Sequence, residues 1–173
     1  YGADVPFIRP QELSNDVVGT RPVTNHTIKF CIEHFYKPEF CCCIYATAPF
    51  LQAKYLQQGL DLLKQDSEKS FAFSVTSFPF PVQRALKIDQ AGISAMFPED
   101  IGKRSQDLQE AYHDAGQFYW GRSDDYLSNK KIFSQHSLAV VLPRHLVQDI
   151  DTPEDWLQAE LMYQAYVQRL KSE

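Results

Sequence analysis

Two aspartates, Asp149 and Asp151, have the residue type and spacing that metal chemistry requires. They follow an apolar stretch that ends near Val147, and in an extended chain residues two apart point to the same side. Ile150 would then face the protein interior while both carboxylates reach into a cleft. Two converging carboxylates suit a hard divalent cation such as Mg²⁺, which takes its remaining ligands from water or substrate phosphates.

The residues that follow indicate the start of a helix, which offers a competing interpretation of the acidic cluster. Thr152 is a good N-cap, Pro153 suits the first helical position, and Asp155 stands three residues after the cap. Acidic residues at such a position often serve only to offset the helix dipole. This explanation covers Thr152, Glu154 and Asp155 well, but it covers Asp149 poorly because that residue precedes the cap. From the local pattern alone, both interpretations of the aspartate pair stay open.

Composition limits the class of protein. The chain has 173 residues, of which 44% are hydrophobic and 23% charged, which is enough for a single domain with a proper core. A net charge of −5 argues against broad binding to nucleic acid or to an anionic membrane, and no apolar run approaches the ~20 residues of a membrane span. The cysteines lack zinc-site spacing and are expected to be small buried residues, three of them in a central strand, which fits a cytoplasmic protein: Cys31, Cys41, Cys42 and Cys43.

Apolar runs and helical periodicities alternate along the chain. Strands are expected at residues 5–8, 41–45, 71–75 and 138–142, and helices at 23–35, 55–64 and 153–170. This alternation predicts an α/β fold with an open, mostly parallel, Rossmann-like sheet. Ligands of such sheets bind beyond the carboxyl ends of the strands. Arg9, Thr47 and Asp149 each follow a predicted strand, and they are therefore expected to share one rim.

The middle of the chain departs from this pattern. Residues from about 83 to 133 are interpreted as an inserted arm that begins with short antiparallel strands around Gly92. Their aromatic density exceeds what a small excursion needs for its own core, so the arm is expected to pack on a partner or to cover a ligand.

Arginines and one histidine are further candidates for chemistry. Several arginines lie in turn-like surroundings, where a guanidinium group can bind carboxylate or phosphate, or can simply form surface salt bridges: Arg9, Arg21, Arg84, Arg104 and Arg144. His113 and Asp114 form either an orienting pair for acid–base work or a structural pair.

Seven segments together resemble one family. In chain order they begin at Val5, Gly19, Ile44, Pro81, Arg104, Tyr112 and Gln148, and they span essentially the whole chain. By these segments the chain resembles the acylneuraminate cytidylyltransferases, or CMP-sialic acid synthetases, and within them the pseudaminic acid branch. The resemblance implies a single domain with a nucleotide-diphospho-sugar transferase-like fold. It also implies that the inserted arm is a dimerisation region that reaches over the active site of a neighbour.

The resemblance implies a reaction and roles for individual residues. The family joins CMP from CTP to a nine-carbon α-keto acid sugar and releases pyrophosphate. Asp149 and Asp151 match its catalytic, Mg²⁺-binding acids. Nucleotide contacts are expected at Arg9, Thr20 and Thr47, and sugar contacts at Tyr45, Gln83, Arg84, Arg104 and Tyr119. The sialic acid branch has Gln at the position of Tyr45, which favours pseudaminic acid as the sugar.

One departure from the family pattern concerns the first residues. The family opens with a Gly-rich basic loop that holds the CTP phosphates, and residues 1–173 contain no such loop. We therefore expect these residues alone to have little or no activity. Two alternatives remain: a sugar-nucleotide glycosyltransferase, which also uses an Asp-x-Asp metal site, and an inactive fragment that only folds and dimerises.

Overall fold

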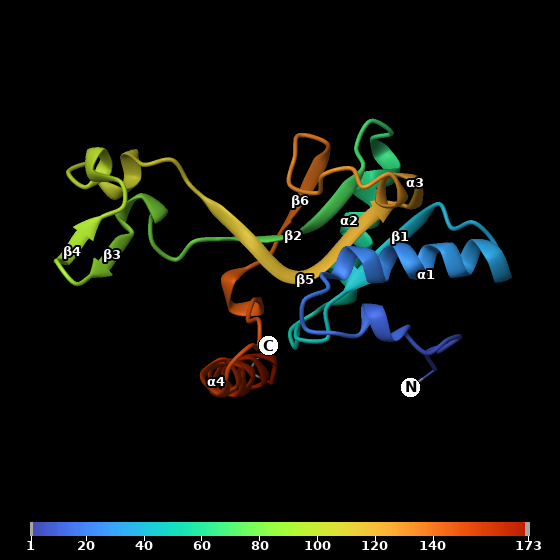
Figure 1. Ribbon diagram of the computed structural model, residues 1–173. Coiled ribbons are helices and arrows are strands. Elements are labelled where there is room, and N and C mark those ends of the chain that lie inside the picture. The colour runs from blue at the N-terminus through green and yellow to red at the C-terminus, as the bar shows by residue number, and fades with distance from the viewer. Residues whose placement is uncertain (1, 172–173) are drawn as a thin grey trace.

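A four-stranded sheet forms the centre of the molecule (Figure 1). The computed structural model describes residues 2–171. The strand order is β1 (Phe40–Ile44), β5 (Tyr112–Arg122), β2 (Phe71–Ser77) and β6 (Ser137–Val141). β5 is antiparallel to both of its neighbours, whereas β2 and β6 are parallel. The α/β class is thus confirmed, but the sheet is mixed because β5 returns between two strands that both run the other way.

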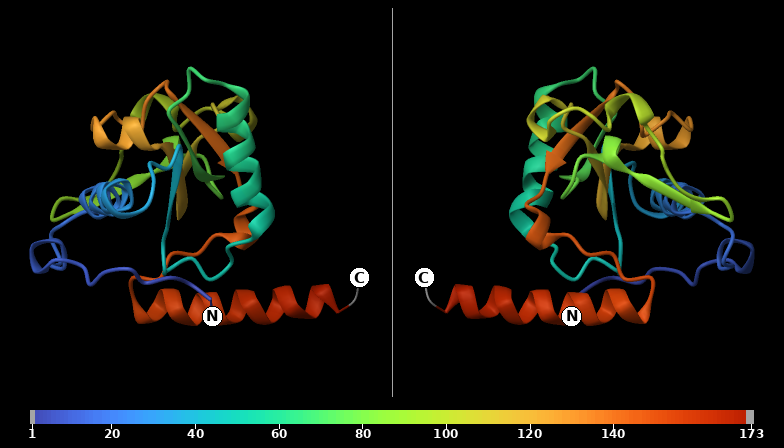
Figure 2. Two further views of the ribbon diagram at one scale, coloured as in Figure 1. Left: turned by 90° about the vertical axis from the view of Figure 1, so that its right-hand side faces the viewer. Right: turned by 90° about the vertical axis from the view of Figure 1, so that its left-hand side faces the viewer.

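Helices cover both faces of this sheet, as Figure 2 shows. On one face, α2 (Ala53–Gln65) packs against the cluster around Phe118, Val140 and Leu142. On the other face, Ile28 of α1 (Thr20–His34) packs against Phe71 of β2 and against α3 (Ser123–Leu127). The two faces alternate along each strand, as the period of two requires. No helix of the described residues is long and apolar enough to cross a membrane.

Two strand predictions need correction. Residues 5–8 form no strand: Val5 and Ile8 are 84% and 94% exposed, and Pro6 removes one of the backbone donors that a ladder would need. β1, which carries Cys41 to Cys43, is an edge strand of the described sheet rather than a central one. These cysteines form no disulfide, and they are partly buried because α1 and α2 cover the two faces of this strand.

The projecting arm is shorter than the stretch 83–133. Its hairpin consists of β3 (Leu86–Asp89) and β4 (Gly92–Ala95), which pair with each other and lie well away from the main sheet (Figure 1). Residues 112–127, which were expected in the arm, form β5 and α3 of the main body. Phe118, Tyr119 and Tyr126 of this stretch are therefore buried in the core of the domain, whereas Tyr112 is 46% exposed.

The remaining elements are α4 and several short turns of 3-10 helix. α4 (Pro153–Leu170) has the predicted bounds and begins with a capping box between Thr152 and Asp155. It packs through Ala159 against Phe50 and Leu146. The turns are Gln11–Leu13, Val82–Arg84, Pro98–Asp100, Ser105–Asp107 and Arg144–Leu146.

Candidate functional site

The acidic loop, residues 147–152, leads from the last 3-10 turn into α4 and carries Asp149 and Asp151. Ile150 packs against the cluster of Phe50, Leu146 and Ala159, whereas both aspartates line an open cavity of about 490 Å³. The alternation predicted from the sequence is therefore confirmed. The apolar Ile150 faces the interior, and the acids on either side of it face the cavity.

The start of α4 is stabilised by Asp155 rather than by the aspartate pair. The carboxylate of Asp155 accepts hydrogen bonds from the backbone N–H of Thr152 at 2.8 Å and of Asp151 at 3.2 Å, and from the Thr152 hydroxyl at 2.7 Å. The bond from the Thr152 hydroxyl is the largest influence that lowers the pKa of Asp155. Within residues 2–171, no α4 amide bonds to the side chain of Asp149 or Asp151. The helix-start explanation thus covers Thr152 and Asp155 and leaves the pair free for another role.

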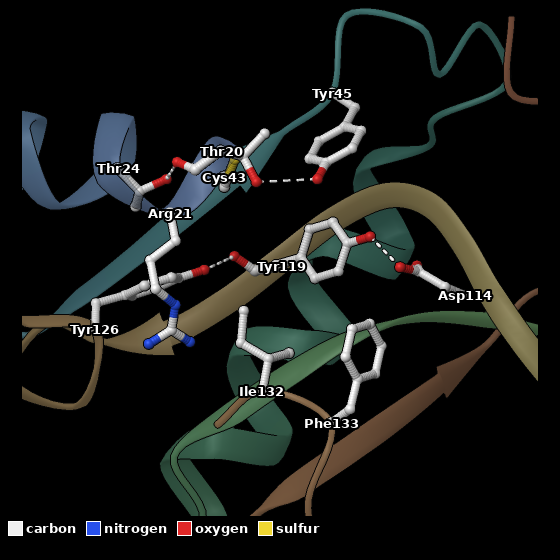
Figure 3. Close-up of a pocket in the computed structure, with 10 residues that line it drawn as sticks. All are labelled: Thr20, Arg21, Thr24, Cys43, Tyr45, Asp114, Tyr119, Tyr126, Ile132 and Phe133. Carbon is white, nitrogen blue, oxygen red and sulfur yellow. Dashed lines mark hydrogen bonds between the residues drawn. The ribbon is translucent and has the colours of Figure 1, made fainter. Parts of the chain in front are cut away.

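Two tyrosines form the wall that this large cavity shares with a smaller one of about 150 Å³ (Figure 3). The ring centroids of Tyr45 and Tyr119 lie 5.2 Å apart. The hydroxyl of Tyr45 is 3.0 Å from Thr20 Oγ1, and the hydroxyl of Tyr119 donates to the carboxylate of Asp114. Burial, followed by the hydrogen bond and charge of Asp114, raises the pKa of Tyr119. Tyr119 is therefore a neutral hydrogen-bond donor at physiological pH.

Asp114 is a further carboxylate of the larger cavity, which the sequence suggested only as a partner of His113. A shift of register in the β2–β5 ladder lies between Asp114 and Tyr119, and Gly116 within it has φ 62°. The N–H of Gly116 donates to Asp114 Oδ1 at 3.0 Å. His113 bonds to the backbone carbonyl of Asp114 and not to its carboxylate, so these side chains are not an orienting pair. A glycine within a strand pattern was the signal for this bulge.

Several expected site residues do not line either cavity. Gln83 and Arg84 donate to backbone carbonyls of the arm, and Arg104 forms an ion pair with Asp107 at 2.7 Å. Arg9 is exposed ahead of the first 3-10 turn, and Thr47 lies in the turn after β1. The structure thus brings together Thr20, Tyr45, Tyr119, Asp149 and Asp151 around two adjoining cavities and leaves the arm residues apart from them.

Arg21 also lines the smaller cavity, yet its surroundings suggest packing. Its guanidinium group lies 5.5 Å from the ring centroid of Phe71 and 5.7 Å from that of Tyr126, within the range of cation–π attraction. It therefore fixes the first turn of α1 on the face of the sheet.

The oxygen ligands of the larger cavity fit a hard cation that takes some of its ligands from the protein and the rest from a substrate. Asp149 and Asp151 both face the cavity, and Asp149 Oδ1 is oriented by a bond from the backbone N–H of Ile150 at 3.1 Å. Within the described chain, no group of three His, Cys, Asp or Glu residues could hold a metal alone. Two carboxylates without further protein ligands are typical of Mg²⁺ bound together with phosphates.

Comparisons with known proteins complete the description. The pseudaminic acid cytidylyltransferase of Campylobacter jejuni subsp. jejuni serotype O:2 is 42% identical over 164 residues, which cover 94% of this chain and 70% of that protein. The N-acylneuraminate cytidylyltransferase of Escherichia coli O18:K1:H7 is 24% identical over 90% of this chain and 36% of its own length. A search of family models gave no match.

Among solved structures, CMP:2-keto-3-deoxy-manno-octonic acid synthetase complexed with CTP is 12% identical over 82% of this chain and 68% of its own, with a TM-score of 0.49. That similarity is too low to add to the assignment. The fold and the cavity define an α/β protein with a paired-carboxylate site. Because of its identity to these sequence relatives, the chain belongs to the acylneuraminate cytidylyltransferase family. Within that family it is similar to a second pseudaminic acid cytidylyltransferase of Campylobacter jejuni subsp. jejuni, from serotype O:23/36, with 41% identity over 94% of this chain and 70% of that protein.

Proposed function

We propose that the full-length enzyme transfers CMP from CTP to pseudaminic acid, a nine-carbon acidic sugar, with release of pyrophosphate, and that this chain supplies its metal-binding acids and the tyrosines that face the sugar. One observation carries the proposal. The two acids that match the family's metal site line a single cavity together with Tyr45 and Tyr119. The chain that carries them is 42% identical to a pseudaminic acid cytidylyltransferase of Campylobacter jejuni. The reaction requires the anomeric hydroxyl of the sugar to attack the α-phosphorus of CTP. Both reactants are anions, so their charge must be neutralised before they can approach.

The chain's own residues divide this work between binding and orientation. Asp149 and Asp151 would hold Mg²⁺, which neutralises charge on the phosphates and on the departing pyrophosphate. Thr20 would contact the nucleotide, and Thr47, in the turn after β1, and Arg9, ahead of the first 3-10 turn, are proposed as further nucleotide contacts. Tyr119 offers the sugar a wall and a neutral phenol, because its hydroxyl donates a hydrogen bond to the carboxylate of Asp114.

Tyr45 is proposed to select the sugar. Its ring stands between Thr20 and Tyr119, where the sialic acid branch has an amide side chain. An aromatic ring favours an apolar substituent over a hydroxylated one at this position. The full-length enzyme is expected to use pseudaminate and to reject N-acetylneuraminate, and comparable turnover of both sugars would disprove this role for Tyr45.

The arm is proposed to complete the site of a second copy in a homodimer. Its hairpin exposes a cluster of apolar side chains: Leu86 at 57%, Ile88 at 79%, Ile93 at 68% and Met96 at 56%. Arg84 stands two residues before β3 and bonds to the backbone carbonyl of Lys103, the neighbour of Arg104, and neither arginine lines the two cavities of its own chain. Delivery to the partner's cavity would place Gln83 and both guanidinium groups beside the acidic sugar.

A measurement of pyrophosphate release from CTP and free pseudaminate by the full-length enzyme tests the reaction. Asp149→Asn and Asp151→Asn are each expected to lower turnover at least 100-fold with little change in melting temperature. Both carboxylates face the cavity, and an Asn at 149 keeps an oxygen for the Ile150 amide. Asp61→Asn is the matched control, because this acid of α2 bonds only to Gln57 among the described side chains. Equal losses of stability and turnover in the two site variants would favour a structural role for the pair.

A further inference from the structure

Gln117 is a buried polar side chain for which the proposed reaction has no use. It lies in β5 and is 1% exposed. Its side-chain amide nitrogen, Nε2, donates to the backbone carbonyl of Leu146. A buried amide is costly unless it is paired, so its one described bond fixes where the partner carbonyl lies. That carbonyl belongs to the last residue before the acidic loop.

The acidic loop is held at both of its ends and, between them, by Ile150, which packs against Phe50, Leu146 and Ala159. At its C-terminal end, the Asp155 carboxylate accepts from the backbone N–H of Asp151 and of Thr152. At its N-terminal end, Val147 packs into the cluster around Phe118. Between them, Asp149 and Asp151 line the cavity. The position of the pair therefore depends on the two ends of the loop as well as on Ile150.

Gly116, the neighbour of Gln117, approaches Asp149 directly. A Cβ atom at this glycine would lie 3.2 Å from Asp149 Oδ2. The same bulge of β5 thus leaves room for the carboxylate at residue 116 and ties the loop's backbone at residue 117. Both contacts come from one short segment with a shifted register, 114–118. The conformation of this segment therefore determines where the acidic loop lies relative to β5.

We propose that Gln117 is a positioning residue, which acts through the Leu146 carbonyl to hold Asp149 and Asp151 in place for the reaction. This inference rests on the proposed function for its catalytic consequence only. The anchoring itself is a property of the chain that can be measured without substrate.

Thr76 provides a matched control. It is 2% exposed, and its hydroxyl donates to the backbone carbonyl of Leu142 at 2.9 Å. Gln117→Met and Thr76→Val each remove one buried hydrogen-bond donor to the segment that connects β6 to the acidic loop. Each also keeps the approximate size of the side chain. The two differ in their distance from the acidic loop, since Leu142 lies at the end of β6 and Leu146 adjoins the loop.

The test is hydrogen exchange of the amides in residues 147–152 of the full-length protein, at a temperature where every variant is folded. Gln117→Met is expected to speed exchange there at least tenfold, because the residue that enters the loop loses its hydrogen bond to β5. Thr76→Val is expected to leave exchange in this segment unchanged. Equal exchange in wild type and Gln117→Met, or equal acceleration in both variants, would overturn the proposal.

Turnover is the second readout and separates this inference from the proposed function. A small displacement of catalytic groups can cost about 100-fold in rate. Gln117→Met is expected to lower kcat 10- to 100-fold with KM for CTP changed by less than threefold, whereas Thr76→Val keeps both. A wild-type protein without pyrophosphate release would refute the proposed function, and hydrogen exchange would still decide the anchoring. An active Gln117→Met variant with wild-type kcat would refute the positioning role.

Discussion

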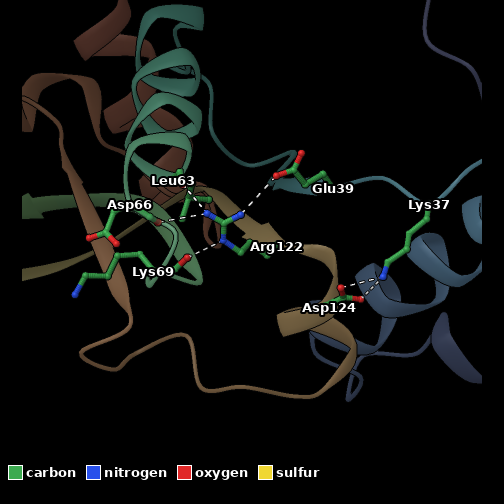
Figure 4. Close-up of polar contacts among 7 residues, drawn as sticks. All are labelled: Lys37, Glu39, Leu63, Asp66, Lys69, Arg122 and Asp124. Atoms are coloured by element: carbon green, nitrogen blue, oxygen red, sulfur yellow. Dashed lines mark hydrogen bonds and ion pairs between the residues drawn. The ribbon is translucent and has the colours of Figure 1, made fainter.

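Arg122 fixes the C-terminal end of α2, and its replacement gives the most sharply defined test of the packing (Figure 4). Its guanidinium group donates to the carbonyls of Leu63 at 2.7 Å, Lys69 at 3.0 Å and Asp66 at 3.3 Å. These carbonyls lie at or just beyond the last turn of the helix, where intrahelical partners are missing. Glu39, 76% exposed and 3.6 Å away, adds little because solvent screens the pair.

The expected magnitude follows from these bonds. Bonds to a charged donor contribute about 1.5–3 kcal/mol each, and the exposed carbonyls recover part of this from water. Taking the two shorter bonds at the lower value, Arg122→Ala should lower the free energy of unfolding by about 3 kcal/mol. For a chain of this size that corresponds to a fall in Tm of roughly 6–12 °C. Arg122→Lys should lose about half as much, because an ammonium cannot span all three carbonyls.

Thermal and urea unfolding measure this change, with Lys37→Met as the control. Lys37 forms an ion pair with Asp124 at 2.8 Å, but the side chains are 56% and 74% exposed. Its loss should therefore cost no more than about 0.5 kcal/mol. If Arg122→Ala were no more destabilising than Lys37→Met, the bonds to the α2 carbonyls would contribute nothing beyond a surface ion pair, and the reasoning would be refuted.

Two further predictions concern the core. Gly121→Ala should destabilise the protein by about 1–3 kcal/mol in urea unfolding, because a Cβ there would overlap Tyr126 Cε2 and lie 2.6 Å from Phe71 Cδ1; Gly102→Ala, which meets nothing within 4 Å, should change stability by less than about 0.5 kcal/mol. Burial raises the pKa of Cys42 to about 12 and that of Cys41 to about 11, from an ordinary 9.0. Unfolded thiols lose their protons near pH 9 while the folded ones keep them, so the stability that they contribute is complete below pH 9 and declines as pH rises toward 11–12. The urea midpoint should decrease as the pH is raised from about 8.5 to 10.5, and it should decrease less in Cys42→Ala. An equal decrease of the midpoint with pH in both proteins would contradict this origin.

Local signals predicted the acidic loop and α4 well. The N-cap at Thr152, the proline at the first helical position and the helical spacing beyond it indicated both ends of α4. Ile150 and its flanking acids also followed from a period of two, which needs no knowledge of the rest of the chain. Such features depend on neighbours within a few residues.

The rest depended on contacts that are distant in sequence. β5 pairs with residues about 40 positions before it on one side and about 80 on the other, and nothing within Tyr112–Arg122 indicates those partners. Its aromatic residues therefore suggested an arm, although Phe118 and Tyr119 lie in the core. Gln117 was missed and Asp114 was paired with the wrong side chain for the same reason, since their contacts arise from a bulge and from a carbonyl 29 residues away.

The isolated hairpin of the arm has a consequence for how the protein melts. β3 and β4 pair only with each other among the described strands, and a two-stranded hairpin is marginally stable by itself in water. Its order therefore draws on whatever covers its apolar side chains. Calorimetry of the dilute monomer should show an early, weakly cooperative loss of the hairpin ahead of the main transition. At concentrations where two copies associate, the two transitions should merge, and the melting temperature should rise with protein concentration.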